Sequence, residues 1–190
     1  MTIPNLLTLA RIVLIPVLIL VFYLPTSWSS ITAAAIFLLA SLTDWLDGFV
    51  ARKFEQTSTF GAFLDPVADK LLVASILLLL VGAGDRGYIT LPAIVIVGRE
   101  IVISALREWM AEVGDRASVA VSYIGKVKTT VQMTALILLL AFKPVMAMSM
   151  SAVFGILGMV LLYVAAILTI WSMVAYLMVA WPTFIKKTHE

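Results

Sequence analysis

The sequence predicts an all-α integral membrane protein that crosses the bilayer six times. Of its 190 residues, 63% are hydrophobic and only 13% are charged, and the mean hydropathy is +1.11. This composition is too apolar for a soluble domain of that length. A spanning helix needs about 20 apolar residues, and suitable segments lie at residues 5–24, 29–51, 62–82, 89–111, 126–147 and 152–181. We therefore expect one membrane domain over residues 1–190.

The first segment follows a proline and contains three polar positions. Ile3-Pro4-Asn5 is expected to break an interfacial start from the spanning helix, because proline is tolerated in a first turn and not inside a helix. No basic stretch precedes the segment and no convincing cleavage site follows it, so we interpret it as mature protein rather than a signal sequence. Asn5, Thr8 and Arg11 are best interpreted as capping and anchoring this helix, with contact to a substrate as the alternative.

The second segment ends in an acidic face. Asp44, Asp47, Gly48 and Ala51 fall at i, i+3, i+4 and i+7, so a helix places them on one side. The small residues would let a backbone or a ligand approach closely. Arg52 follows at once and is suited to bind a phosphate oxygen through charge-assisted hydrogen bonds.

The third segment carries a matching acidic face. Gly61, Asp65 and Asp69 fall at i, i+4 and i+8, and only a short loop separates them from the second segment. We therefore expect two antiparallel neighbouring helices whose carboxylates share one crevice near the membrane surface. Pro66 fits either a first-turn position or a local kink.

Four aspartates within 26 residues of otherwise apolar sequence indicate a metal site. Buried carboxylates are costly unless a cation neutralises them. Oxygen ligands without cysteine or histidine favour Mg²⁺ or Mn²⁺, and four acids suggest two ions. Two ions about 3.5–4 Å apart commonly clamp a phosphoryl group during in-line displacement. The rival hypothesis is a cation channel or carrier, which predicts acids spread through the membrane depth.

The basic residues predict the orientation, because short loops rich in lysine and arginine stay in the cytoplasm. They follow the second, fourth and sixth segments, at Arg52, Lys53, Arg107, Arg116, Lys126, Lys128, Lys186 and Lys187, whereas the other side has only Arg86 and Lys143. Both termini and the acidic cluster should therefore be cytoplasmic, with residues 25–28, 83–88 and 143–151 outside. A net charge of +2 is too small to suggest nucleic-acid binding.

The acidic pattern also carries a resemblance to a known family. The arrangement Asp44-x2-Asp47-Gly48-x2-Ala51-Arg52-x8-Gly61-x3-Asp65-x3-Asp69 resembles the signature of the CDP-alcohol phosphotransferases at every fixed position. Residues 4–11, the Arg99-Glu100 and Arg107-Glu108-Trp109 groups, and residues 125–130 are similar to the bacterial branch whose acceptor is glycerol 3-phosphate. These motifs extend to about residue 133, and the remaining apolar third does not discriminate between branches.

The resemblance implies an activity, a location and site roles. It implies a multi-pass enzyme of the bacterial inner membrane, usually a homodimer, that transfers phosphatidyl from CDP-diacylglycerol to glycerol 3-phosphate and releases CMP. Carried over by position, Asp44, Asp47 and Asp65 would bind metal, and Asp69 would touch one metal and act as general base. The CDP moiety would be bordered by Gly48, Ala51, Arg52 and Gly61. The runner-up within the family is a cardiolipin synthase, whose acceptor is a lipid.

The acceptor phosphate requires its own cationic pocket. Arg107, Lys126 and Lys128 are the expected ligands for glycerol 3-phosphate, because they lie at the depth of the acidic cluster and favour a soluble anion. Arg99 lies two helical turns before Arg107, on nearly the same face. Two interpretations of Arg99 stay open: a phosphate ligand, or a buried ion pair with an acid on a neighbouring helix. Lys126 and Lys128 could alternatively serve only as topology signals.

Overall fold

The chain folds into helices at the expected places. The computed structural model describes residues 3–54, 59–83, 87–113, 123–142 and 150–187, with the side chains of 3–4, 44–59, 62, 123–124, 126 and 182–187 outside the description. Its helices are α1 (Ile3–Tyr23), α2 (Ser29–Phe54), α3 (Thr59–Gly82), α4 (Gly87–Glu112), α5 (Tyr123–Ala141) and α6 (Met150–Lys187). The described part contains no β-strand. The all-α prediction is therefore confirmed.

The helix boundaries differ from the apolar segments at the charged ends. α2 continues to Phe54, and α3 begins at Thr59. Helix α2 thus continues past Asp44, Asp47 and Arg52, and α3 begins two residues before Gly61, where hydropathy alone would end each segment sooner. Pro66 lies inside α3, past its first turn, so the first-turn interpretation of this proline is wrong. Pro4 lies in the first turn of α1, which runs unbroken from Ile3 to Tyr23 with Pro16 inside it, so the expected break at residues 3–5 is wrong.

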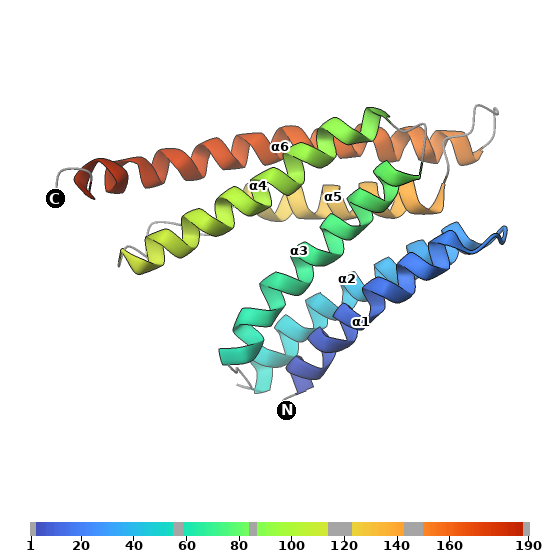
Figure 1. Cartoon of the computed structure of the whole chain (residues 1–190), viewed down its shortest axis with the longest axis horizontal. Helices are drawn as coiled ribbons and strands as arrows, with labels where there is room; N and C mark the ends of the chain where they lie inside the picture. The colour runs from blue at the N-terminus through green and yellow to red at the C-terminus, as the bar shows by residue number, and fades with distance from the viewer. Residues whose placement is uncertain (1–2, 55–58, 84–86, 114–122, 143–149, 188–190) are drawn as a thin grey trace.

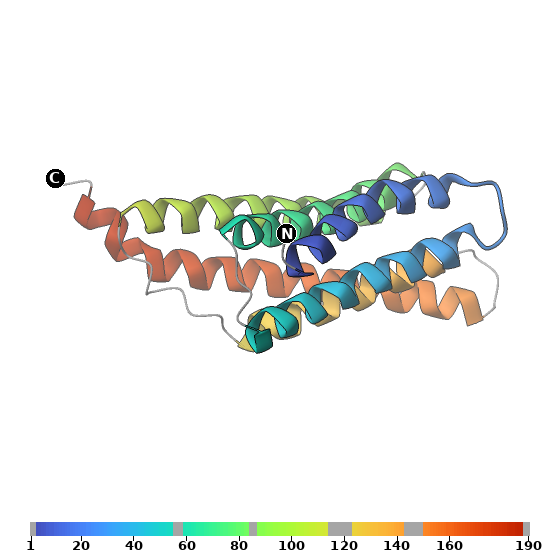
Figure 2. The same cartoon turned by 90° about the horizontal axis from the view of Figure 1, so that it is seen from below.

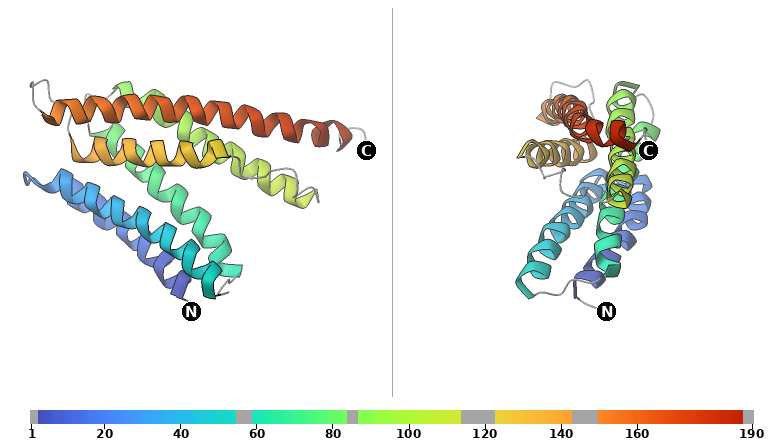
Figure 3. Two further views of the ribbon diagram at one scale, coloured as in Figure 1. Left: turned by 180° about the vertical axis from the view of Figure 1, so that it is seen from behind. Right: turned by 90° about the vertical axis from the view of Figure 1, so that its left-hand side faces the viewer.

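The helices form two layers. Helices α1, α3 and α4 make one layer, and α2, α5 and α6 make the other (Figure 2 and the right-hand view of Figure 3). Contacts join the layers through the pairs α1 with α2, α3 with α5 and α4 with α6. Helix α1 packs against both α2 and α3, so it lies beside both helices that carry the acidic pattern. In the described part α2 and α3 do not themselves pack closely along their lengths, so the expectation that they are direct neighbours is not confirmed.

Successive helices run in alternating directions. The C-terminal ends of α1, α3 and α5 gather with the N-terminal ends of α2, α4 and α6 at the right of Figure 1. Both chain termini lie away from that end (Figure 1). Three described helical stretches are long and apolar enough to cross a bilayer: Asn5–Tyr23, Gly87–Glu112 and Met150–Trp181. Shorter apolar helices cover Ser29–Thr43 and Val127–Ala141.

A small apolar cluster joins Ile103, Leu106 and Met110 of α4 to Ala180 of α6, and the main apolar core draws buried residues from each helix from α1 to α6. Leu18, Phe37, Ile76 and Leu136 are among its fully buried members and come from four different helices. Large apolar side chains such as Leu20 point outward instead, at 71% exposure. An apolar outer surface is suited to the hydrocarbon interior of a bilayer. The packing therefore agrees with the membrane location that the composition predicts. The polar side chains described below border this core, because Val73 belongs to both the core and the lining of the polar cavity.

Candidate active site

Helix α1 supplies polar partners for the two described aspartates of α3. Thr8 Oγ1 donates a hydrogen bond to Asp65 Oδ1 at 2.5 Å, and Arg11 Nη1 donates to Asp69 Oδ1 at 2.5 Å. Thr8 and Arg11 are three residues apart, and Asp65 and Asp69 are four apart, so each pair occupies one helix face. Both carboxylates are thereby held against α1.

This arrangement corrects the interpretation of Thr8 and Arg11 as capping and anchoring residues. Both side chains are fully buried, and both contact the acidic pattern. An inward-facing guanidinium is costly in an apolar interior unless it is paired. The i, i+3, i+6 spacing of Asn5, Thr8 and Arg11 was the sequence signal for such an inward polar face.

The other half of the predicted metal site belongs to α2. Its final turns include Asp44, Asp47, Gly48, Ala51 and Arg52, whose side chains lie outside the described residues. Among the side chains that are described, no three potential metal ligands form a group. The four-aspartate metal site therefore stays a prediction.

The described part of the site fits a hard divalent cation. Asp65 and Asp69 offer carboxylate oxygens, which are the ligands that Mg²⁺ and Mn²⁺ prefer. Asp69 keeps 43% of its side chain exposed although its partner Arg11 is fully buried. Gly61, one helical turn before Asp65, is buried. Asp65 and Asp69 are thus held by hydrogen bonds from α1, and Asp69 remains partly accessible to a ligand.

Asp69 also opens onto a small polar cavity. The cavity has a volume of about 180 Å³ and lies between α3, α4 and α5. It is lined by Asp69, Lys70, Val73, Glu100, Lys128, Thr129, Gln132 and Met133. Two acids, two lysines and an amide therefore meet in a space suited to a molecule smaller than a typical drug-sized ligand.

One wall of this cavity is an ion network centred on Glu100. Lys128 Nζ donates to Glu100 Oε1 at 2.9 Å, and Arg99 Nη1 donates to the same oxygen at 2.8 Å. Arg99 Nη2 also donates to Ser172 Oγ on α6 at 3.4 Å. The ion pair expected as one role of Arg99 is present, but its acid is the adjacent residue of α4 and not one on a neighbouring helix.

The predicted acceptor ligands divide into two groups. Lys128 lines the cavity beside Asp69. Arg107 and Arg99 instead meet at Tyr176 of α6, with guanidinium carbons 5.3 and 5.8 Å from the ring centroid. Arg107 also donates to Tyr176 Oη at 3.1 Å. The predicted shared face of the two arginines is confirmed, whereas the side chain of Lys126 lies outside the described residues.

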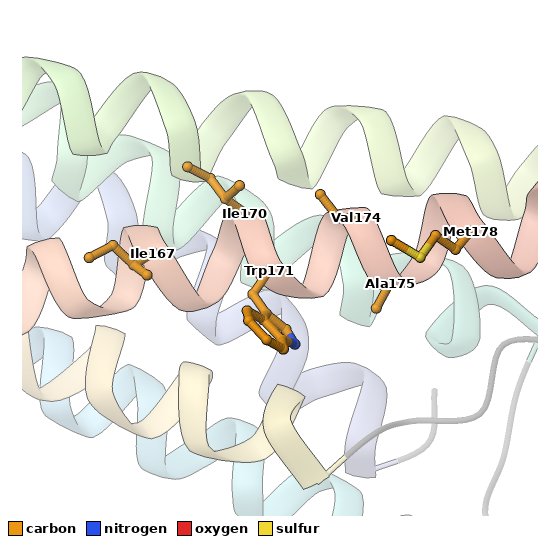
Figure 4. Close-up of a pocket in the computed structure, with 6 residues that line it drawn as sticks. All are labelled: Ile167, Ile170, Trp171, Val174, Ala175 and Met178. Atoms are coloured by element: carbon orange, nitrogen blue, oxygen red, sulfur yellow. The ribbon is translucent and has the colours of Figure 1, made fainter.

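A larger groove on α6 has a different character. It has a volume of about 490 Å³ and is lined by Ile167, Ile170, Trp171, Val174, Ala175 and Met178 (Figure 4). None of these side chains can take a proton or ligate a hard cation. The groove is suited to apolar contact, so the polar cavity beside Asp69 is the candidate active site.

Comparison with known proteins assigns the family. The model of the CDP-alcohol phosphatidyltransferase family matches residues 1–183. The chain belongs to this family. A Sodalis glossinidius (strain morsitans) protein named CDP-diacylglycerol–glycerol-3-phosphate 3-phosphatidyltransferase is 54% identical over 180 residues, which is 95% of each chain. Relatives of the same name from Escherichia coli (strain K12) and Shigella flexneri serotype 5b are 55% identical over 178 residues, 94% of each chain.

Membership of the CDP-alcohol phosphatidyltransferases agrees with the local chemistry. The family generally depends on divalent metal ions. The carboxylate oxygens of Asp65 and Asp69 on α3 are suitable ligands for such an ion. The reaction of such an enzyme joins an alcohol to a phosphorus atom, which requires a group that accepts the hydroxyl proton. A partly exposed carboxylate beside a polar cavity, as at Asp69, has the chemistry that such a group needs.

Proposed function

We propose that this chain transfers the phosphatidyl group of CDP-diacylglycerol to glycerol 3-phosphate, forming phosphatidylglycerophosphate and CMP. The observation that carries the proposal is the cavity of about 180 Å³ in which the Asp69 carboxylate and the Lys128 ammonium face one space. A proton acceptor and an anion-binding cation are the two groups that a phosphorylated alcohol requires. The names of the 54–55% identical relatives support the same substrates.

The proposed setting is the bacterial inner membrane, crossed six times by a single domain of residues 1–190. Both termini and the active site would be cytoplasmic, which is consistent with the excess of basic residues after α2, α4 and α6. A lipid pyrophosphate has its acyl chains in the bilayer and its cytidine in water, so its reacting phosphorus lies at the interface. We further propose a homodimer as the functional unit.

Two divalent ions, Mg²⁺ or Mn²⁺, would be held by Asp44, Asp47, Asp65 and Asp69. When bound, these ions neutralise the pyrophosphate charge and stabilise the departing CMP. Gly48, Ala51, Arg52 and Gly61 would border the CDP moiety. The small residues leave room for the nucleotide, and the guanidinium binds a phosphate oxygen.

Asp69 would act as the general base. Its carboxylate takes the proton of the primary hydroxyl of glycerol 3-phosphate as that oxygen attacks the phosphorus bearing diacylglycerol. One phosphorus–oxygen bond forms, and the bond to the CMP oxygen breaks. Arg11 keeps Asp69 Oδ1 engaged at 2.5 Å, so the carboxylate cannot rotate freely. Thr8 restrains Asp65 in the same way.

Lys128 would bind the acceptor phosphate, with Lys126, Arg107 and Arg99 extending the positive field. Glu100 balances two of these cations, because one of its oxygens accepts from both Lys128 and Arg99, and it holds Lys128 at the cavity wall. A volume of about 180 Å³ suits a small phosphomonoester better than the lipid acceptor of a cardiolipin synthase. The soluble acceptor is therefore favoured.

The test is CMP release by the purified protein in detergent, with CDP-diacylglycerol and Mg²⁺. We expect release with glycerol 3-phosphate, and none with phosphatidylglycerol, serine or inositol 1-phosphate. Chelator should stop the reaction, and added Mg²⁺ or Mn²⁺ should restore it. Release with phosphatidylglycerol alone would indicate a cardiolipin synthase. No release with any acceptor from folded, metal-loaded protein would favour the transport hypothesis.

Lys126→Ala should raise the KM for glycerol 3-phosphate and leave the KM for CDP-diacylglycerol unchanged. Removing one ammonium from an anion site weakens binding of the anion in the ground and transition states alike. Steady-state kinetics with each substrate varied in turn measures both constants. Lys187→Ala, in the basic C-terminal tail, is the matched control. An unchanged KM for the acceptor would assign Lys126 to membrane topology alone.

A further inference from the structure

Gln132 on α5 presents a buried hydrogen-bond acceptor that the proposed reaction has not used. The side chain is 4% exposed, and its Oε1 atom has no hydrogen-bond partner among the described residues. Buried polar atoms are almost always satisfied, because an unmet acceptor loses its hydration without compensation. An exception in a native structure therefore calls for a ligand or for water.

The position of Gln132 indicates which ligand could satisfy it. Gln132 lies four residues after Lys128 on the same face of α5, and both line the cavity that also contains Asp69. The cavity thus combines a base on α3 with a cation and an amide on α5. A small molecule bound there would meet all three groups.

We propose that Gln132 is a specificity-determining residue that accepts a hydrogen bond from the secondary hydroxyl of glycerol 3-phosphate. The inference rests on the proposed function. With the phosphate at Lys128 and the attacking primary hydroxyl at Asp69, the secondary hydroxyl lies between them along the three-carbon chain. It is the only remaining donor of the acceptor molecule, and Gln132 Oε1 is a buried acceptor in the same cavity wall.

The chemical consequence is selection for a phosphorylated diol. A site built to hydrogen-bond a substrate hydroxyl discriminates strongly against the analogue that lacks it, because the buried protein group is then left unpaired. 3-Hydroxypropyl phosphate is that analogue: it keeps the phosphate and the primary hydroxyl and lacks only the secondary one. The enzyme should therefore use it less well than glycerol 3-phosphate.

The experiment compares kcat/KM for the two acceptors in the full-length enzyme and in Gln132→Met, which keeps the side-chain volume and removes the acceptor. The unmodified enzyme should prefer glycerol 3-phosphate by about 10- to 100-fold. In Gln132→Met this preference should collapse toward unity, through loss of activity on glycerol 3-phosphate while activity on the analogue persists. A merely structural role would lower both activities equally and keep their ratio.

Two further variants keep the result decisive. Thr134→Val removes a polar group from an exposed position of α5 that does not line the cavity, so it should retain the full preference. Gln132→Asn draws the carbonyl back by one methylene and should also reduce the preference, which provides a test if the methionine variant does not fold. An unchanged ratio in either folded Gln132 variant would overturn the inference. Failure of the unmodified enzyme to use glycerol 3-phosphate would instead contradict the proposed function.

Discussion

Replacing Asp69 by asparagine is expected to lower kcat on the order of 10²- to 10⁴-fold, the usual contribution of a general base, while CDP-diacylglycerol still binds. Asparagine has nearly the same shape, and its carbonyl oxygen can still accept the hydrogen bond from Arg11 that Asp69 Oδ1 accepts now. It cannot take a proton from the attacking hydroxyl. The packing of α3 against α1 should therefore survive, and the chemical step should not.

Turnover is measured as CMP release, and lipid binding by titration of CDP-diacylglycerol in the presence of Mg²⁺. Glu112→Gln is the matched control, since it makes the same carboxylate-to-amide change at an exposed position at the end of α4. Asp44→Asn, at a proposed metal ligand, should weaken lipid binding as well as turnover. Full activity of Asp69→Asn would remove the base assignment, and equal loss of lipid binding in both aspartate variants would make Asp69 a metal ligand only.

The helices could be predicted because the apolar segments are long and separated by short polar linkers. The sequence also predicted that Asp65 and Asp69 lie on one face of α3, because side chains four residues apart in a helix point to the same side. Its error lay at the polar ends, where α2 and α3 extend further than hydropathy suggests. A helix ends where its backbone hydrogen bonds end. Polar residues indicate only where the chain is expected to leave the membrane.

The partners of the site residues could not be predicted from periodicity alone. Thr8 and Arg11 are separated from Asp65 and Asp69 by more than 50 residues, and only the packing of α1 against α3 brings them together. The sequence predicts Lys128 as a phosphate ligand, whereas it leaves Arg99 open between that role and an ion pair. Because both bind one oxygen of Glu100, a single carboxylate determines where two cations are held. Such tertiary pairings depend on how each helix is rotated about its own axis relative to its neighbours. A single sequence does not determine that rotation.

The location of the charges bears on the transport alternative. The described ionisable groups of the site, on α1, α3, α4 and α5, pair with one another, Arg11 with Asp69 and Lys128 with Glu100. An ion path would require polar groups along the depth of the membrane. The stretches 12–23, 71–82, 87–98 and 129–141, which lead from the site to the opposite end of these helices, contain no charged residue. The arrangement therefore favours interfacial chemistry over conduction.

Arg11→Met is expected to reduce kcat by about 10- to 100-fold, the usual effect of losing a group that orients a metal-binding or catalytic carboxylate. The guanidinium is fully buried, and Asp69 is nearly half exposed, so Arg11 is the fixed member of the pair. Without it the carboxylate can leave the orientation in which it faces the cavity. Arg11→Lys should lose less kcat than Arg11→Met, because lysine keeps the positive charge but lacks the planar guanidinium group with its several N–H donors.

A merely destabilised protein would imitate this result, so a second buried residue of α1 is needed for comparison. Leu18→Ala removes a fully buried side chain of the apolar core and should lower the Tm without touching Asp69. At a temperature where both variants are folded, Arg11→Met should lose at least ten times more kcat than Leu18→Ala, with both substrate KM values close to those of the unmodified enzyme. Equal kcat in the two variants would show that Arg11 supports the fold alone. A selective loss would establish that orientation of Asp69, which depends on a helix more than 50 residues distant in sequence, sets the rate of the chemical step.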